Sequence, residues 1–250
     1  MSESYFARPA ISNSAMKEII KSPAHFIEWV QGLPENSRKP HFRIGQALHH
    51  RILDEGKEDR IRIFHGSKSA STFQSAAGKA FLDINHPQFI CLTPEELETV
   101  EGMEKAVRAE KRIMALIRGG MKEVELYWDE PTLRGFQPAK AMLDCLGNTY
   151  IMDLKTTSED IEWFAKNARR FYEIQASWYQ HAAFVYDGIL RPFYFVVVET
   201  KRPHGVRMFE AGPDFLKRGE IKWKTAIEVY AKCMAEGEWP GYNNDLIEVI

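Results

Sequence analysis

The segment Ala139–Lys155, AKAMLDCLGNTYIMDLK, contains the strongest structural signal in this sequence. Apolar residues alternate along its first half, stop at Gly147-Asn148 and resume after Thr149. A Gly-Asn pair between two apolar runs is typical of a β-hairpin with a two-residue turn. We therefore expect two antiparallel strands, with Leu146 and Thr149 flanking the turn.

This register determines which side chains share a face of the predicted hairpin. Asp144 lies opposite Ile151, and Met142 lies opposite Asp153. Because side chains alternate with a period of two, Asp144, Asp153 and Lys155 project the same way. The two aspartates are diagonal neighbours with Cα atoms about 7–8 Å apart, close enough for both carboxylates to bind one hard cation. The hairpin thus indicates a metal site with a lysine directed at it.

The same pattern allows a simpler interpretation, in which the charges form the solvated face of a surface hairpin and Asp153 pairs with Lys155. Two observations oppose it. The second strand, YIMDLK, has the composition of a central strand, where charged side chains need a reason. The opposite face of the hairpin is apolar and consists of Leu143, Cys145, Tyr150, Met152 and Leu154.

The composition is that of a soluble globular protein of enzyme size. The chain has 250 residues, of which 44% are hydrophobic and 27% charged, enough to bury a substantial core. The net charge is −2, so any contact with nucleic acid must come from a local basic surface. The three cysteines are widely spaced, which predicts a protein without disulfides or structural zinc. The sequence shows no secretion signal and no membrane-spanning run, so we expect a cytoplasmic protein.

The order of the predicted elements indicates an α/β fold. The run 193–199, FYFVVVE, is apolar on both faces and predicts a buried strand parallel to a neighbour, and 206–210 predicts an edge strand. We expect a mixed central sheet flanked by helices, with an N-terminal helical region. The remaining strands are expected over 89–92, 123–128, 139–146 and 149–155, and the helices over 14–20, 23–30, 42–53, 69–82, 94–117, 160–170, 172–186 and 213–236.

Two of these helices carry further candidates for the site. Gln175 and Tyr179 share a helix face, from which an amide and a phenol can hold a phosphate. The alternative is a surface glutamine and a half-buried core tyrosine. His49 follows Gly45 by one turn, and a neutral imidazole is a good partner for two carboxylates at a divalent metal. His49 can equally be structural, and His50 competes for the role.

The hairpin and the helix that follows it resemble the core of PD-(D/E)xK nucleases. The first motif of that core matches 143–144, although Leu143 replaces the proline. The second motif matches Asp153–Lys155, and a trailing Q-x-x-x-Y helix matches Gln175–Tyr179. The resemblance implies a restriction-endonuclease-like fold.

Three upstream segments extend the resemblance. Gly45–His49 is similar to the G-x-x-x-H motif of the branch that contains phage exonuclease domains. Ile11–Ser14 and Ser22–Phe26 resemble the opening of the exodeoxyribonuclease VIII family, the phage and prophage recombination exonucleases. The resemblance implies one domain over 1–250: a mainly helical part at 1–120 with the G-x-x-x-H motif, a catalytic sheet core at 121–210, and a C-terminal helix and tail at 211–250.

The resemblance also implies a role for each matching residue. The metal ligands would be His49, Asp144, Asp153 and the backbone carbonyl of Leu154. Lys155 would position the attacking water and stabilise the developing charge, while Gln175 and Tyr179 would contact DNA near the scissile phosphate. Glu125 occupies the place of an additional acidic residue and is a candidate ligand for a second metal. The cation would be Mg²⁺, with Mn²⁺ as a substitute.

The activity implied by the family is that of a DNA exonuclease. It would degrade linear double-stranded DNA from the 5′ end and leave a 3′ single strand for a single-strand annealing recombinase. Relatives form rings, which implies a homo-oligomer here. The family also implies a phage or prophage protein that acts in the host cytoplasm. The alternatives are a structure-specific endonuclease and a non-catalytic DNA-binding or assembly protein. Candidate DNA-binding residues are Arg43, Lys166, Arg169 and Arg170.

Overall fold

The computed structural model describes residues 5, 7–36, 39–54, 59–66 and 72–242. The predicted helices and strands follow one another in the predicted order, with one additional short strand and one helix divided in two. Within the described residues, no helix combines the length and the apolar character needed to cross a bilayer. The first half contains α2 (Asn13–Lys21), α3 (Pro23–Asn36), α4 (Pro40–Leu53), β1 (Ile61–Ile63), α5 (Ala76–Asn85), β2 (Ile90–Leu92), α6 (Pro94–Ala109) and α7 (Lys111–Gly119). The second half contains β3 (Met121–Thr132), β4 (Gly135–Leu146), β5 (Ile151–Thr157), α8 (Ile161–Phe171), α9 (Glu173–Asp187), β6 (Phe193–Glu199), β7 (Val206–Glu210) and α10 (Pro213–Glu236).

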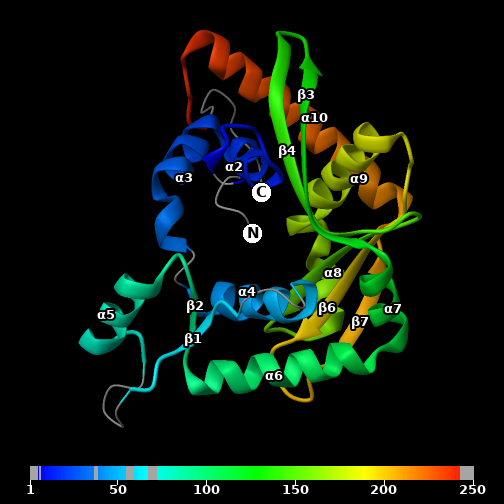
Figure 1. Cartoon of the computed structure of the whole chain (residues 1–250). Coiled ribbons are helices and arrows are strands. Elements are labelled where there is room, and N and C mark those ends of the chain that lie inside the picture. The colour runs from blue at the N-terminus through cyan, green and yellow to red at the C-terminus, as the bar shows by residue number, and fades with distance from the viewer. Residues whose placement is uncertain (1–4, 6, 37–38, 55–58, 67–71, 243–250) are drawn as a thin grey trace.

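A five-stranded mixed sheet forms the centre of the fold, in the order β3-β4-β5-β6-β7. The pair β5 and β6 is parallel and the other pairs are antiparallel. This arrangement confirms the prediction of a mixed sheet, with 193–199 as a buried parallel strand and 206–210 at the edge. The β3–β4 hairpin extends well beyond the other strands, alongside α10 (Figure 1).

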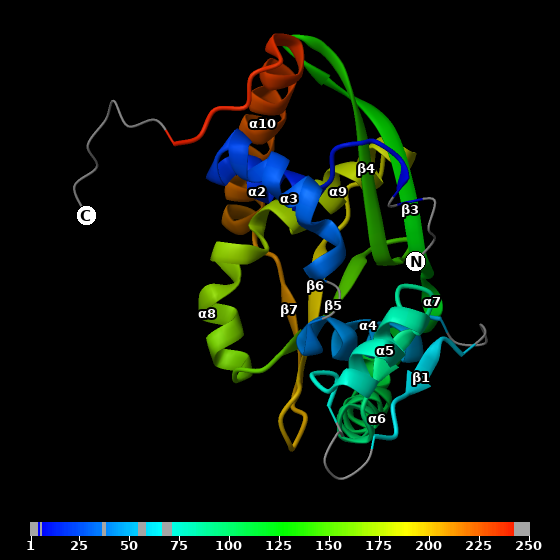
Figure 2. The same ribbon diagram turned by 90° about the vertical axis from the view of Figure 1, so that its left-hand side faces the viewer.

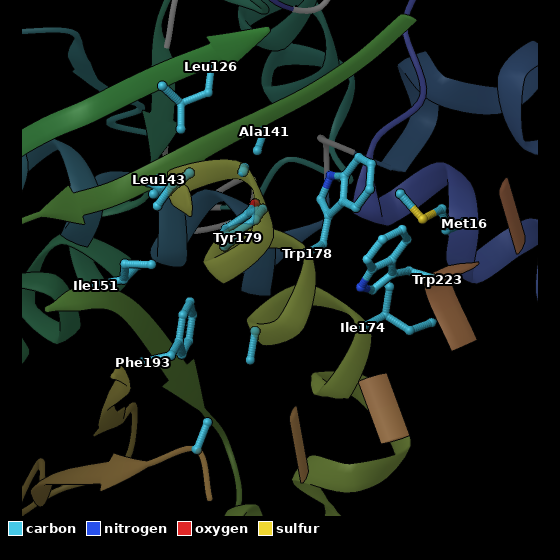
Figure 3. Packing of buried hydrophobic residues seen from close by; sticks show 14 of the residues in the cluster. Met16, Leu126, Ala141, Leu143, Ile151, Ile174, Trp178, Tyr179, Phe193 and Trp223 are labelled. Carbon is cyan, nitrogen blue, oxygen red and sulfur yellow. The ribbon is translucent and has the colours of Figure 1, made fainter. Parts of the chain in front are cut away.

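Helices cover both faces of this sheet and bury a separate core on each. One core lies between the sheet and α2, α8, α9 and α10, and its largest members include Trp178 and Phe193 (Figure 3). The other lies between the sheet and α4, α6 and α7. Figure 2 shows the sheet between α8 on one side and α4 and α6 on the other. The charged residues of β5 must therefore lie between two apolar layers.

Several boundaries differ from the sequence-based expectation. The helix expected over 94–117 is divided at Glu110, where the backbone turns to φ −80° and ψ 87°. The sequence does not predict the short strand β1, which pairs in parallel with β2. Residues 69–71 of the helix expected over 69–82 lie outside the described residues, and α5 begins at Ala76, where Ser75 caps it.

The hairpin register is also corrected. The structure pairs Leu146 with Ile151 and Cys145 with Met152, so four residues form the loop instead of the expected two. The backbone N–H of Gly147 donates to the Tyr150 carbonyl at 2.9 Å, which closes this wider loop. The shift in register places Asp144 directly opposite Asp153 instead of diagonal to it.

Candidate metal and phosphate site

The two opposed aspartates lie where the ladder between β4 and β5 opens. Backbone pairing of the two strands ends at Cys145 and Met152. Beyond that point the backbone N–H of Leu154 donates to Oδ2 of Asp144 at 2.7 Å. A side-chain carboxylate therefore replaces the missing backbone acceptor, and this hydrogen bond fixes the direction of the Asp144 side chain.

Helix α4 brings His49 to the same point of the sheet. Its Nε2 lies 2.8 Å from the carbonyl oxygen of Leu154, and its Nδ1 lies 3.7 Å from Oδ2 of Asp144. One turn earlier, a Cβ added at Gly45 would lie 3.4 Å from Oγ1 of Thr156. The helix can approach β5 this closely because position 45 has no bulky side chain. The sequence prediction that associates His49 with the hairpin agrees with this geometry.

Strand β3 supplies a third group, and it is Glu123 instead of the expected Glu125. One potential ligand atom from each of His49, Glu123 and Asp144 can be chosen so that all three lie within 4.8 Å of one another. Glu125 is directed elsewhere, and its Oε2 accepts a hydrogen bond from the hydroxyl of Tyr127 at 2.9 Å.

The pairing of β3 with β4 explains this correction. Lys122 pairs with Cys145 and Val124 pairs with Leu143, so Glu123 is opposite Asp144. Glu123 also has φ of +52°, which interrupts the alternation of side chains expected in a strand. The register of β3 against β4 would have identified Glu123, but the strand sequence alone does not give that register.

The second aspartate forms its own network on the α9 side of the sheet. Asp153 is fully buried, and Nζ of Lys155 lies 2.5 Å from its Oδ2. Nε2 of Gln175 donates to Oδ1 of the same carboxylate at 2.7 Å. One turn further along α9, the hydroxyl of Tyr179 accepts a hydrogen bond from Nδ2 of Asn13 at 3.1 Å. The structure thus brings Gln175 to the aspartate and connects Tyr179 to α2.

Burial and mutual repulsion disturb the ionisation of these groups. Burial, followed by the charge of Asp153, raises the pKa of Asp144 to about 8. Burial and the Asp144 carboxylate also raise the pKa of Glu123. Burial and the Lys155 ammonium lower the pKa of His49. Burial alone would lower the pKa of Lys155, but the carboxylates of Asp153 and Asp144 outweigh it and raise that pKa.

This donor set fits a hard divalent cation. The carboxylates of Glu123 and Asp144 repel each other, and a divalent cation bound between them would relieve this repulsion. The carbonyl oxygen of Leu154 and the imidazole of His49 lie beside them. Oxygen ligands with one imidazole suit Mg²⁺ or Mn²⁺.

A cleft of about 1040 Å³ opens over this cluster. His49, Leu154 and Lys155 line its floor, and α2, α3 and α4 contribute much of its walls. The walls include the aromatic side chains of Phe26, Trp29, Phe42, Tyr172 and Tyr179.

The four basic residues proposed to bind DNA have different environments. Lys166, Arg169 and Arg170 are exposed on α8. Arg43 is only 4% exposed, and its Nη2 forms an ion pair with Oε1 of Glu96 at 2.5 Å. Its guanidinium also lies over the ring of Phe73. The structure thus places Arg43 in the interior, where its charge is not available to DNA, because α4 packs against α6 at this point.

A solved structure shares the fold of this chain over its whole length. A solved structure from Eubacterium rectale, titled "Putative exonuclease", is similar to this chain with a TM-score of 0.67 and 15% identity, covering 100% of this chain and 95% of that one. The structure of SSO0001 gives a TM-score of 0.33 at 11% identity, covering 72% of this chain and 83% of that one. No curated protein matches.

The family comparison covers most of the chain. The family described as "PDDEXK-like domain of unknown function (DUF3799)" matches residues 12–249. This match and the similarity of fold support a nuclease, in agreement with the mixed sheet and with the acidic cluster at β4 and β5. The chain belongs to this family of PDDEXK-like domains.

Proposed function

We propose that this protein is a divalent-cation-dependent exonuclease that hydrolyses phosphodiester bonds of linear double-stranded DNA. The observation that carries the proposal is the convergence of His49, Glu123 and Asp144 beside the pair formed by Asp153 and Lys155. This arrangement combines a place for a cation with an ammonium group, and both can stabilise the negative charge that develops when water attacks a phosphodiester. It needs no serine or cysteine nucleophile.

In this proposal each group has a defined task. His49, Glu123, Asp144, Asp153 and the Leu154 carbonyl would hold Mg²⁺ or Mn²⁺. When bound, the cation supplies Lewis acidity and lowers the pKa of a bound water. Lys155 would donate hydrogen bonds to the attacking water and to a non-bridging phosphate oxygen. Gln175 holds the Asp153 carboxylate in place for these contacts.

The finer parts of the proposal rest on the family resemblance. We propose degradation from the 5′ end that leaves a 3′ strand for a single-strand annealing partner, a ring of identical subunits, and a phage or prophage origin with action in the host cytoplasm. Exposed Lys166, Arg169 and Arg170 would contact the DNA backbone outside the cleft.

The test is digestion of a linear plasmid and of the same plasmid as a closed circle, in Mg²⁺, in Mn²⁺ and in EDTA. We expect only the linear form to be lost, and only with metal. Duplexes labelled separately at each 5′ and 3′ end then determine the polarity. Early release of 5′-labelled nucleotides would support the proposed direction, and early release of 3′-labelled nucleotides would refute it.

Two other outcomes would replace the proposal. Cleavage of both plasmid forms would identify an endonuclease. Binding of DNA without cleavage in any metal, at pH values from 6.5 to 9, would identify a non-catalytic DNA-binding protein of the same fold. An Asp153→Asn variant is the negative control, because it keeps the volume of the side chain and loses its charge.

A further inference from the structure

Helix α2 contributes a second lysine to the surroundings of the site. Asn13 and Lys17 are four residues apart, so they lie on one face of α2. Asn13 donates to the hydroxyl of Tyr179, and Nζ of Lys17 lies 5.5 Å from the centre of the Tyr172 ring. These partners, Tyr179 and Tyr172, lie on either side of Gln175 in the sequence. This face of α2 therefore packs along the start of α9, where Gln175 contacts Asp153.

The same tyrosine ring also contacts the lysine of the site. Nζ of Lys155 lies 5.5 Å from the centre of the Tyr172 ring, as Nζ of Lys17 does. The face of an aromatic ring attracts a cation, but the contribution is only about 0.5–2 kcal/mol. Tyr172 thus brings two ammonium groups close to each other without neutralising either.

The charges of the two lysines are balanced differently. Lys155 has the carboxylate of Asp153 at 2.5 Å. In the described part of the chain, Lys17 has no ion-pair partner, and the adjacent Glu18 pairs with Lys21 at 2.7 Å. Lys17 is nevertheless half-buried beside a second positive charge. Burying a charge without a partner is unfavourable, and an anion would relieve the cost.

The ionisation of Lys17 is consistent with this imbalance. Burial, followed by repulsion from the Lys155 ammonium, lowers the pKa of Lys17 to about 8, and the weaker attraction of the Asp153 and Glu18 carboxylates does not offset it. Because this pKa lies above 7, the side chain still carries its proton in most molecules at pH 7. A positive charge therefore remains available to an anionic ligand under ordinary conditions.

We propose that Lys17 binds a phosphate of the DNA backbone next to the phosphate that is hydrolysed. This inference rests on the proposed nuclease function and extends its site to α2. The scissile phosphate would lie at the acidic cluster and Lys155, so Lys17, which contacts the same Tyr172 ring as Lys155, is placed to contact the neighbouring phosphate. The ligand is a phosphodiester, and the contact is independent of base sequence.

The first test compares Lys17→Met with Lys21→Met, a control on the same helix whose lysine is exposed and paired with Glu18. Binding of a fluorescein-labelled oligonucleotide is measured by anisotropy in Ca²⁺, over a range of salt concentrations. Lys17→Met should weaken binding about tenfold and lower the slope of log affinity against log salt by about 1. Lys21→Met should change neither, and Lys17→Arg should restore most of the affinity.

A second test uses the substrate itself. Oligonucleotides carrying one uncharged methylphosphonate are prepared with the modification at successive positions from the scissile bond. In the wild type, one position next to the scissile phosphate should raise KM about as much as Lys17→Met does on unmodified DNA. In Lys17→Met the same modification should have little further effect, because charge and partner act as one pair.

The outcomes separate this inference from the proposed function. If the wild type cleaves DNA and Lys17→Met equals Lys21→Met in affinity and salt slope, the assignment of Lys17 fails and the nuclease stands. If the wild type neither binds nor cleaves DNA, the proposed function fails as well. A structural role for Lys17 would lower the melting temperature of Lys17→Met, whereas removal of a charge repelled by Lys155 should leave it unchanged or raise it.

Discussion

Asp144 and Leu154 are connected across β4 and β5 by a hydrogen bond from a backbone N–H to a side-chain carboxylate, 2.7 Å long. In an ordinary sheet the acceptor would be a backbone carbonyl of the neighbouring strand. Here the strands have separated, and one oxygen of Asp144 completes the hydrogen bonding of β5. The residue therefore has a structural contact as well as its place in the acidic cluster.

The first prediction separates these two contributions. Asp144→Asn should retain an acceptor for the Leu154 N–H, whereas Asp144→Ala leaves that buried donor unpaired. We expect the alanine variant to have a free energy of unfolding about 1–3 kcal/mol lower than the asparagine variant. Both should lose metal-dependent hydrolysis. Urea unfolding measures the difference, and equal stabilities would show that the hydrogen bond contributes nothing.

The second prediction uses two glutamates on one strand. Glu123→Gln should lower the affinity for Mn²⁺ at least about tenfold, because a carboxylate leaves the cluster of His49 and Asp144. Glu125→Gln should leave that affinity unchanged, since its carboxylate contacts Tyr127 instead. Isothermal titration calorimetry with Mn²⁺ provides the comparison. If Glu125→Gln lowers the affinity for Mn²⁺ and Glu123→Gln does not, then Glu125 is the metal ligand and Glu123 is not.

The third prediction concerns pH. The pKa of Asp144 is about 8 in the folded metal-free protein and about 3.9 when unfolded. Between these values the folded state holds a proton that the unfolded state has released. The free energy of unfolding should therefore fall as pH rises from 6.5 to 8, by up to about 1.4 kcal/mol per pH unit. His49, whose pKa is lowered, has the opposite effect only below its unfolded pKa of about 6.5.

Metal provides the check on this pH dependence. A divalent cation binds the deprotonated carboxylates, so Mn²⁺ should raise the melting temperature more at pH 8 than at pH 6.5. In Asp144→Asn, both the fall in stability with rising pH and the larger stabilisation by Mn²⁺ at pH 8 should be much smaller. A stability profile in Asp144→Asn as steep as in the wild type would assign the titration to another group.

The fourth prediction distinguishes a buried arginine from an exposed one. Arg43→Met should lower the free energy of unfolding by about 3 kcal/mol, because it leaves the largely buried carboxylate of Glu96 without its partner. Arg169→Met should leave stability within about 0.5 kcal/mol and should weaken DNA binding in low salt. If Arg43→Met folds normally and loses DNA affinity instead, the interior assignment of Arg43 is wrong.

The sequence predicts the parts of this site that depend on local chemistry. Gly147-Asn148 correctly indicates a turn, and Gly45 with His49 correctly indicates a helix close to the hairpin. The length of the turn is decided by distant contacts. The hydroxyl of Tyr150 donates to the carbonyl of Leu116, and Nε of Arg191 donates to the carbonyls of Gly147 and Asn148. The turn propensities of neighbouring residues do not include these contacts with distant parts of the chain.

Two other features could not be obtained from the sequence for the same reason. Glu123 joins the cluster through the pairing of β3 with β4 and through a positive φ, and neither is visible in an alternating strand. Arg43 lies in the first turn of α4, next to other basic residues in the sequence, yet its environment is decided by Glu96, which lies 53 residues away in the chain. Tertiary partners, more than local pattern, determine which charges face a ligand.

The missing side chain at Gly45 limits how this site can vary. A methyl group there would just touch Oγ1 of Thr156, at 3.4 Å, so alanine fits. A branched or longer side chain would move α4 away from β5 and would separate the imidazole of His49 from the Leu154 carbonyl. The size of the side chain at position 45 thus determines whether His49, four residues later, can contact the Leu154 carbonyl. A valine at position 45 should therefore have the same effect as loss of the imidazole, although every metal-binding side chain is still present.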